Sequence, residues 1–156
     1  MAVVGLISDT HGILRPEALD ALRGSVAIVH AGDIGDPGIL AELERIAPVT
    51  AVRGNVDRGD LARRLPASAV VTIEGVSIYV LHILDDLDLD PRTAGFHVVV
   101  SGHTHDPMVR MHRDVLYVNP GSAGPRRFQL PVTVAHLTVG EGAPRAEIVT
   151  LPVAGS

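Results

Sequence analysis

The segment VVVSGHTHDP, residues 98–107, places two histidines at the end of an apolar run. Side chains alternate between the faces of a strand, so His103 and His105 would point the same way on an extended backbone. Two neutral imidazoles on one side can share or bridge metal ions. A histidine at a strand end is more often a hydrogen-bonded structural residue, so the pair predicts a metal site only if other segments supply further ligands.

Other apolar runs end in side chains of the same kind. The further candidate ligands that follow such runs are Asp9, His11, Asp33, Asn55 and His82. In open α/β sheets, ligands bind outside the carboxyl ends of the strands, so these carboxylate, amide and imidazole groups can converge on one site. Seven ligands are too many for one ordinary ion. They suit two divalent ions about 3.5–4 Å apart that share a bridging carboxylate, although the residues alone do not say which ligand binds which ion.

Runs rich in valine and isoleucine, separated by turn residues, predict the strands that must position these ligands. We expect strands at residues 3–7, 26–31, 49–52, 69–73, 77–81, 98–101, 115–118, 132–139 and 146–151. The segments PEALDALRG and PGILAELERI, each opening with a proline, predict helices after the first and second strands, which makes the first half β-α-β-α-β. TIEGVSIYVL and VRMHRDVLYV predict hairpins. The sequence therefore predicts an α/β sandwich of two mixed β-sheets flanked by helices, with the polar residues at one rim.

Composition limits the class of protein. A chain of 156 residues suits a single domain over residues 1–156. It has no cysteine, which excludes disulfides and thiolate sites, so nitrogen and oxygen must hold any metal. A net charge of −5, with no lysine, argues against a broad nucleic-acid-binding surface. The amino terminus shows no basic leader or membrane span, so we expect a cytoplasmic protein with no membrane partner, for which homo-oligomers stay open.

Five motifs resemble those of one known superfamily. DTHG, GDIGD, GNVD, the lone His82 and GHTH occur in the order and approximate spacing of the calcineurin-like metallophosphoesterases, and NPGS at residues 119–122 extends the match. The small size resembles the compact YfcE-like phosphodiesterase branch. The resemblance implies a metallophosphoesterase-type sandwich with two ligand sets joined by Asp33. These sets are Asp9, His11 and His105 for one ion, and Asn55, His82 and His103 for the other.

The expected activity is hydrolysis of a small phosphoester, first of all a phosphodiester, by hydroxide that two metal ions generate from water. Asp33 as the bridge, together with Asn55 and His82, forms the catalytic set, and polar contacts from Asn55 and the histidines would stabilise the phosphoryl oxygens. Manganese is the first choice of ion, because nitrogen and oxygen ligands without thiolate accept it. Iron, zinc, cobalt and nickel fit the same ligands.

Two positions depart from the superfamily pattern. Val56 follows Asn55 where many of these enzymes have a histidine that is thought to protonate the leaving oxygen, although the compact branch commonly lacks it too. Ile83 and the acidic run LDDLDLD follow His82 where relatives often have glycine. We therefore expect poor leaving groups to react slowly, since general acid catalysis is worth about 10²–10⁴ in rate.

Several alternatives stay open at this point. A non-enzymatic interaction scaffold of the same fold, like the small retromer subunit with its degraded metal site, is the main rival. An amidohydrolase barrel needs a longer chain and an earlier His-X-His pair. His30 is expected to orient a ligand, and Asp57 to brace the turn at Asn55. Arg126 and Arg127 either meet a substrate phosphate or lie on the surface.

Overall fold

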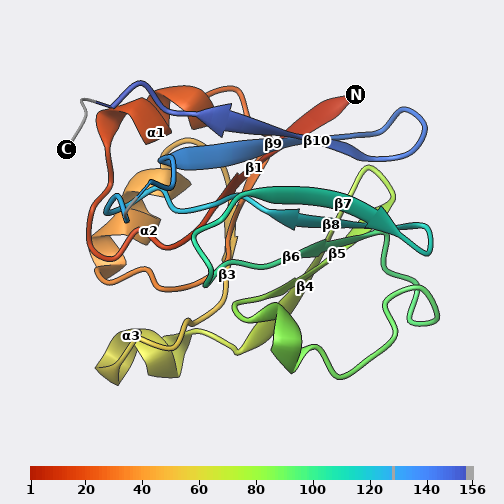
Figure 1. The fold of residues 1–156 in the computed structure, drawn as a ribbon, viewed down its shortest axis with the longest axis horizontal. Coiled ribbons are helices and arrows are strands. Elements are labelled where there is room, and N and C mark those ends of the chain that lie inside the picture. Colours follow the sequence, from red (N-terminus) through yellow and green to blue (C-terminus); the bar gives the residue numbers. More distant parts are fainter. Residues whose placement is uncertain (128, 154–156) are drawn as a thin grey trace.

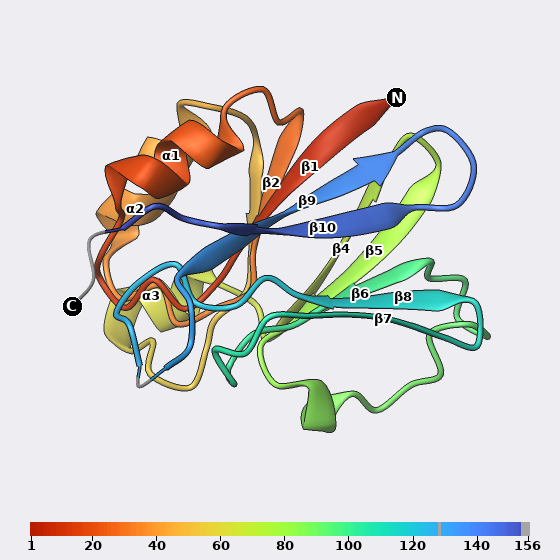
Figure 2. The same cartoon turned by 45° about the horizontal axis from the view of Figure 1, so that its top comes forward.

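The protein folds into two β-sheets that pack face to face, with helices on the outer side of one of them (Figures 1 and 2). The structure, a computed structural model, describes residues 1–127 and 129–153. Strands follow the order β10-β9-β1-β2-β3 in the first sheet and β4-β5-β6-β8-β7 in the second. Both sheets contain parallel and antiparallel pairs, which confirms the expected α/β sandwich of two mixed sheets.

The first sheet contains the β-α-β-α-β half of the chain. Its parallel strands are β1 (Ala2–Ile7), β2 (Ala27–His30) and β3 (Val49–Ala51), and β9 (Thr133–Val139) and β10 (Arg145–Thr150) extend it in antiparallel fashion. The connections are α1 (Pro16–Leu22) and α2 (Pro37–Glu44), each with a proline in its first turn. The Asp36 carboxylate also accepts the Gly38 N–H at 2.8 Å, which caps α2.

The second sheet is built from the two predicted hairpins and one buried strand. Its strands are β4 (Ser68–Ile73), β5 (Val76–Leu81), β6 (Val98–Val100), β7 (Met108–His112) and β8 (Val115–Asn119). Glu74 and Gly75 join β4 to β5 with positive φ angles of 51° and 75°. Arg113 and Asp114 do the same between β7 and β8, at 49° and 65°. Turns of this left-handed kind match the twist of paired strands, which is why both hairpins close tightly.

Two short helical segments were not predicted from the sequence. They are α3 (Gly59–Arg64) and the single 3₁₀ turn η1 (Leu84–Asp86). In α3 only Leu61 is buried and no side chain caps the amino end, so the segment carries neither an apolar stripe nor a start signal. The segment with η1 covers part of the outer face of the second sheet, where Leu84 and Leu87 pack against the cluster that Leu81, Val99, Val115 and Tyr117 form.

The main core lies between the sheets, where side chains such as Leu6, Val29, Ile78 and Val100 have no exposure. A second apolar layer joins the first sheet to α1 and α2. Parallel pairing aligns β1 with β2 and β3, and β5 with β6 and β8. In each sheet, the carboxyl ends of several strands therefore lie at one rim. The candidate ligands lie in the loops that directly follow these strand ends. Among the helices that the structure describes, none is long and apolar enough to cross a membrane.

Candidate metal centre

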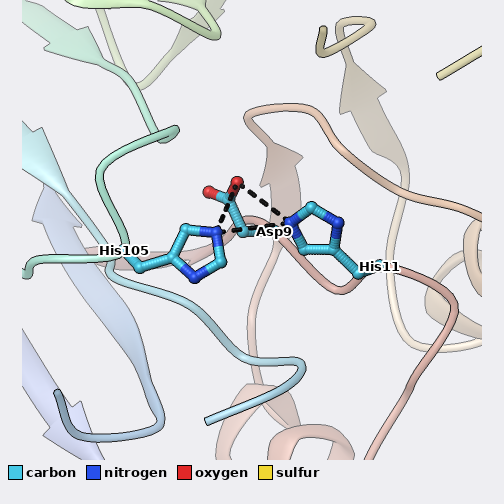
Figure 3. Close-up of side chains that lie close together, drawn as sticks. All are labelled: Asp9, His11 and His105. Atoms are coloured by element: carbon cyan, nitrogen blue, oxygen red, sulfur yellow. Dashed lines mark hydrogen bonds and ion pairs between the residues drawn. The ribbon is translucent and has the colours of Figure 1, made fainter. Parts of the chain in front are cut away.

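Asp9, His11 and His105 form the first group of candidate ligands, and Figure 3 shows their side chains converging. His105 Nε2 lies 3.3 Å from Asp9 Oδ1 and 3.3 Å from His11 Nε2, and His11 Nε2 lies 3.6 Å from Asp9 Oδ1. The point equidistant from three atoms with these separations is about 2.0 Å from each, which is the bond length of a divalent metal to imidazole or carboxylate. The group therefore has the dimensions of a metal site.

The remaining oxygen of Asp9 is fixed by two hydrogen bonds. Ser8 Oγ–H donates to Asp9 Oδ2 at 2.6 Å, and the His103 backbone N–H donates to the same oxygen at 3.0 Å. These bonds leave Oδ1 directed at the imidazoles and buried without a hydrogen-bond donor among the described residues. A buried acceptor of this kind is costly unless a cation satisfies it, which supports a metal ion at this position.

Asp33, His82, His103 and Asn55 form the second group. His82 Nδ1–H donates to the Ala31 carbonyl at 2.7 Å, so the lone pair of the neutral ring is on Nε2. That Nε2 lies 3.0 Å from Asp33 Oδ2, and His103 Nδ1 lies 3.2 Å from Asn55 Oδ1. The lone pairs of His82 Nε2 and Asp33 Oδ2 therefore face each other and require a cation between them, either a proton or a metal ion, whereas His103 can donate an ordinary Nδ1–H hydrogen bond to Asn55 Oδ1.

Asp33 connects the two groups through a single oxygen. Its Oδ1 accepts the Val56 backbone N–H at 2.9 Å. Its Oδ2 lies 3.0 Å from His82 Nε2 in the second group and 3.7 Å from His11 Nε2 in the first. The carboxylate is buried, with 3% exposure, so its orientation is set by the protein rather than by solvent. Its position between the groups is that of a bridging ligand.

The carboxylates and imidazoles of the two groups stabilise each other's charge. Burial opposes the charge of Asp9, but contacts with His105, His11 and Ser8 outweigh it and hold the pKa of Asp9 well below its usual value. Burial likewise opposes the charge on Asp33, whereas His82 lowers the pKa of this carboxyl. The pKa of His82 is raised, because the two carboxylates outweigh the effect of its own burial.

Five of the candidate ligands have an unusual backbone conformation. Positive φ angles occur at Asp9 (55°), His11 (46°), Asp33 (58°), His103 (72°) and His105 (64°). Left-handed backbone is uncommon outside glycine, and asparagine, aspartate and histidine tolerate it best. Its concentration here, away from the two hairpin turns, is typical of functional sites, where surrounding contacts hold the strain in place.

Hydrogen bonds from outside the two groups fix the ligand-bearing loops. The buried Asp57 carboxylate accepts the backbone N–H groups of Ile34, Gly35 and Gly54 at 2.9–3.2 Å, which ties the loop of Asp33 to that of Asn55. This is the bracing role expected for Asp57.

His30 and Ser8 also support the site. His30 Nδ1 accepts the Gly32 N–H at 3.1 Å, directly before Asp33, as expected for a histidine that orients a ligand. The contribution of Ser8 was missed by the sequence analysis, and only its place beside Asp9 could have indicated it. Arg126 and Arg127 are exposed.

The structure thus brings all seven candidate ligands to one rim. The first group consists of the same three residues as the first implied set. The second contains His82, His103 and Asn55 of the other set together with Asp33, and each group takes side chains from loops that follow strands of both sheets. Their donor set of imidazole, carboxylate and amide without thiolate fits divalent transition metals.

Fold and site together define an α/β sandwich with a candidate metal centre at one rim. The chain belongs to the calcineurin-like phosphoesterase superfamily, because the family model of that domain matches residues 2–142. A probable metallophosphoesterase from Methanothermobacter thermautotrophicus is 38% identical over 155 residues, which covers 89% of this chain and 87% of the relative. The resemblance drawn from the motifs is therefore confirmed.

Two solved structures are similar in fold. An archaeal phosphodiesterase has a TM-score of 0.77 at 23% identity, covering 94% of this chain and 99% of its own. Vps29 from Entamoeba histolytica, solved in complex with Zn²⁺, has a TM-score of 0.72 at 20% identity, covering 95% of this chain and 98% of its own. At these identities the likeness concerns the fold alone.

Proposed function

We propose that this protein is a metal-dependent phosphodiesterase that uses two divalent ions. The observation that carries the proposal is the meeting of two groups of lone-pair donors at Asp33 Oδ2, which lies 3.7 Å from one group at His11 and 3.0 Å from the other at His82. Two ions bound there would supply hydroxide from water at neutral pH and neutralise charge on the phosphoryl group. The family and the probable metallophosphoesterase relative support the reaction class.

The side chains of the site have distinct tasks in this proposal. Ala31 holds the proton of His82 on Nδ1, which keeps Nε2 directed at Asp33. Ser8 and the His103 backbone hold Asp9 Oδ2, so that Oδ1 faces the imidazoles. Asn55 is exposed, and its amide group can donate to a phosphoryl oxygen while its carbonyl oxygen faces His103.

The proposed substrate preference follows from Val56. Its side chain is 42% exposed beside Asn55, and it has no proton to give to a departing alcohol. Esters whose alcohol leaves without protonation, such as aryl diesters, should therefore be favoured over alkyl esters. Manganese stays our first choice of metal, with iron, zinc, cobalt and nickel as alternatives for the same donor set.

The proposal is tested by activity profiling of metal-stripped and manganese-loaded protein against phosphomonoesters, phosphodiesters and cyclic nucleotides. We expect hydrolysis of diesters only with metal, and its loss in Asp33→Asn. Asp36→Asn is the matched control, because this exposed carboxylate lies three residues away and asparagine can still cap α2. Hydrolysis that survives chelation, or a metal-loaded protein inactive on the whole panel, would contradict the proposal.

An interaction scaffold of the same fold is the second candidate. The observation in its favour is the similarity to Vps29, and one of these structures contains zinc. Metal binding by this chain would therefore not separate the two functions. Measured turnover separates the two functions. An enzyme should hydrolyse esters at a rate proportional to the metal bound, whereas a scaffold that binds metal should show no such hydrolysis.

A further inference from the structure

Two cavities open beside the second ligand group. The His103 cavity has a volume of about 400 Å³, and its lining includes Ile83, Leu84, Ser101, His103, Pro107 and Met108. The Asn55 cavity has a volume of about 340 Å³, and its walls include Arg53, Asn55, Tyr79, His82 and Ile83. Both volumes are in the range of small-molecule sites, and Ile83 is the residue that lines both.

The His103 cavity offers apolar walls and few free polar groups. The Asn119 amide donates to the Gly102 carbonyl at 3.0 Å and to Thr104 Oγ1 at 3.1 Å, and its oxygen accepts the Gly121 N–H at 2.9 Å. Thr104 Oγ1 also accepts the Asp106 N–H at 3.2 Å. The Asn119 amide and the acceptor positions of Thr104 Oγ1 are therefore already engaged with the protein itself.

The charged residues of the His103 cavity limit the kind of chemical group that can bind there. Among the described residues that line the His103 cavity, the carboxylic acids are Asp85 and Asp106, both exposed, and none is a lysine or arginine. A second phosphate or a carboxylate would be repelled there. An uncharged group would instead bury its surface against Leu84, Pro107 and Met108.

We infer that the ester acted on by this protein carries an uncharged apolar group, aryl or short alkyl, and that this group lies in the His103 cavity. The inference rests on the proposed function, because it requires the phosphoryl group to lie at the candidate metal centre beside His103. The Asn55 cavity, on the other side of Ile83, then leaves room for the second ester group of a diester.

The test compares two inert probes, phenylphosphonate and methylphosphonate, by calorimetry on manganese-loaded protein at a pH where both are dianions. They share the group that would meet the metal centre and differ only in the apolar substituent. Wild-type protein should bind phenylphosphonate about tenfold more tightly, the preference expected if the cavity covers roughly half of the ring.

Two variants place a charge in the cavity. Met108→Asp and Leu84→Asp should each abolish the preference for the phenyl probe. Both residues also pack against the outer face of the second sheet, so each variant is first compared with wild-type protein by its melting curve and its manganese affinity, which a folded variant should retain. Val109→Asp is the matched control. Val109 is the next residue of β7, 41% exposed and directed to the opposite face, so the tenfold preference should persist.

The outcomes separate the two claims. Equal affinity of both probes for wild-type protein, or an unchanged preference in both cavity variants, would overturn the inference. If this occurs while bis(p-nitrophenyl) phosphate is hydrolysed, the proposed function stands without the cavity assignment. A tenfold phenyl preference that both cavity variants abolish, in a protein that hydrolyses no ester, would leave the His103 cavity as a binding site for apolar groups but overturn the proposed function and, with it, the assignment of that group to a substrate ester.

Discussion

His30 should make the protein sensitive to mild acid. The ring has no exposure, and burial lowers the pKa of His30 to about 4. Its Nδ1 accepts the Gly32 N–H, while Thr10 Oγ1 gives its own hydrogen to the Ile34 carbonyl at 2.9 Å and so must accept from His30 Nε2–H at 3.1 Å. Both ring nitrogens are therefore committed in the neutral form, and protonation of Nδ1 would break the bond to Gly32.

The sign and size of the effect follow from linkage. An unfolded histidine takes up its proton near pH 6.5, whereas the folded His30 resists until about pH 4, so the unfolded state is favoured increasingly as the pH falls through this window. Above pH 6.5, His30 is neutral in both states and its titration leaves the free energy of unfolding nearly unchanged. Between pH 7.5 and pH 5 the loss amounts to about 2 kcal/mol, and it reaches about 3 kcal/mol below pH 4.

The assay is urea unfolding of wild-type protein and His30→Asn across this range, with chelator present so that metal binding does not enter. Asparagine retains an acceptor for the Gly32 N–H but does not titrate. His82 has a raised pKa, so its contribution is present below pH 6.5 and is lost as the pH rises through its folded pKa, but it is common to both proteins. The difference between the two profiles therefore isolates His30. Parallel profiles between pH 7.5 and pH 5 would refute the reasoning.

Three further predictions concern the site itself. Manganese at 100 times its Kd should raise the free energy of unfolding by about 2.7 kcal/mol. Asp33→Ala should remove both this gain and hydrolysis. An unchanged melting temperature after chelation of the bound metal would contradict the prediction. Gly54→Ala should destabilise the protein by about 1–3 kcal/mol and weaken metal binding, because its Cβ would overlap the Asp33 carboxylate and backbone nitrogen. Gly38→Ala in α2 is its control, and equal melting temperatures for the two variants would show that the Gly54 contact is not limiting. For wild-type protein, log kcat/KM should fall steeply as the pKa of the leaving group rises. Val56→His should raise kcat/KM for alkyl esters more than for aryl esters, by a factor of up to about 10²–10⁴. A flat plot for wild-type protein would mean that another group already supplies the proton.

Much of the fold could be predicted because local sequence patterns indicate its strands and helices. Runs of valine and isoleucine marked the strands, and the prolines at positions 16 and 37 marked both longer helices. The two sheets could be predicted from these strands, since the need to bury their apolar faces leaves few ways in which the strands can pair. The helix α3 could not be predicted, because six residues with one buried side chain contain no periodic signal.

The arrangement within the site was less accessible to sequence reasoning. The candidate ligands could be found because each follows an apolar run, but their division into two groups came only from the family resemblance. Which oxygen of Asp9 faces the imidazoles depends on Ser8 and on the His103 backbone, and the latter lies 94 residues further along the chain. Contacts at such separation depend on how the two sheets pack. The left-handed backbone at His103 and His105 likewise has no local marker.

Because each ligand group draws on both sheets, an ion bound to either would act as a reversible cross-link. His11 and His105 are 94 residues apart in the chain, and a covalent link that closes a loop of this length is worth about 4–5 kcal/mol in chain entropy. Release of the ions would reopen that loop and remove this contribution to stability, while the core between the sheets remains. The lifetime of the folded protein would then depend on the supply of metal, as that of a secreted protein depends on an oxidising environment.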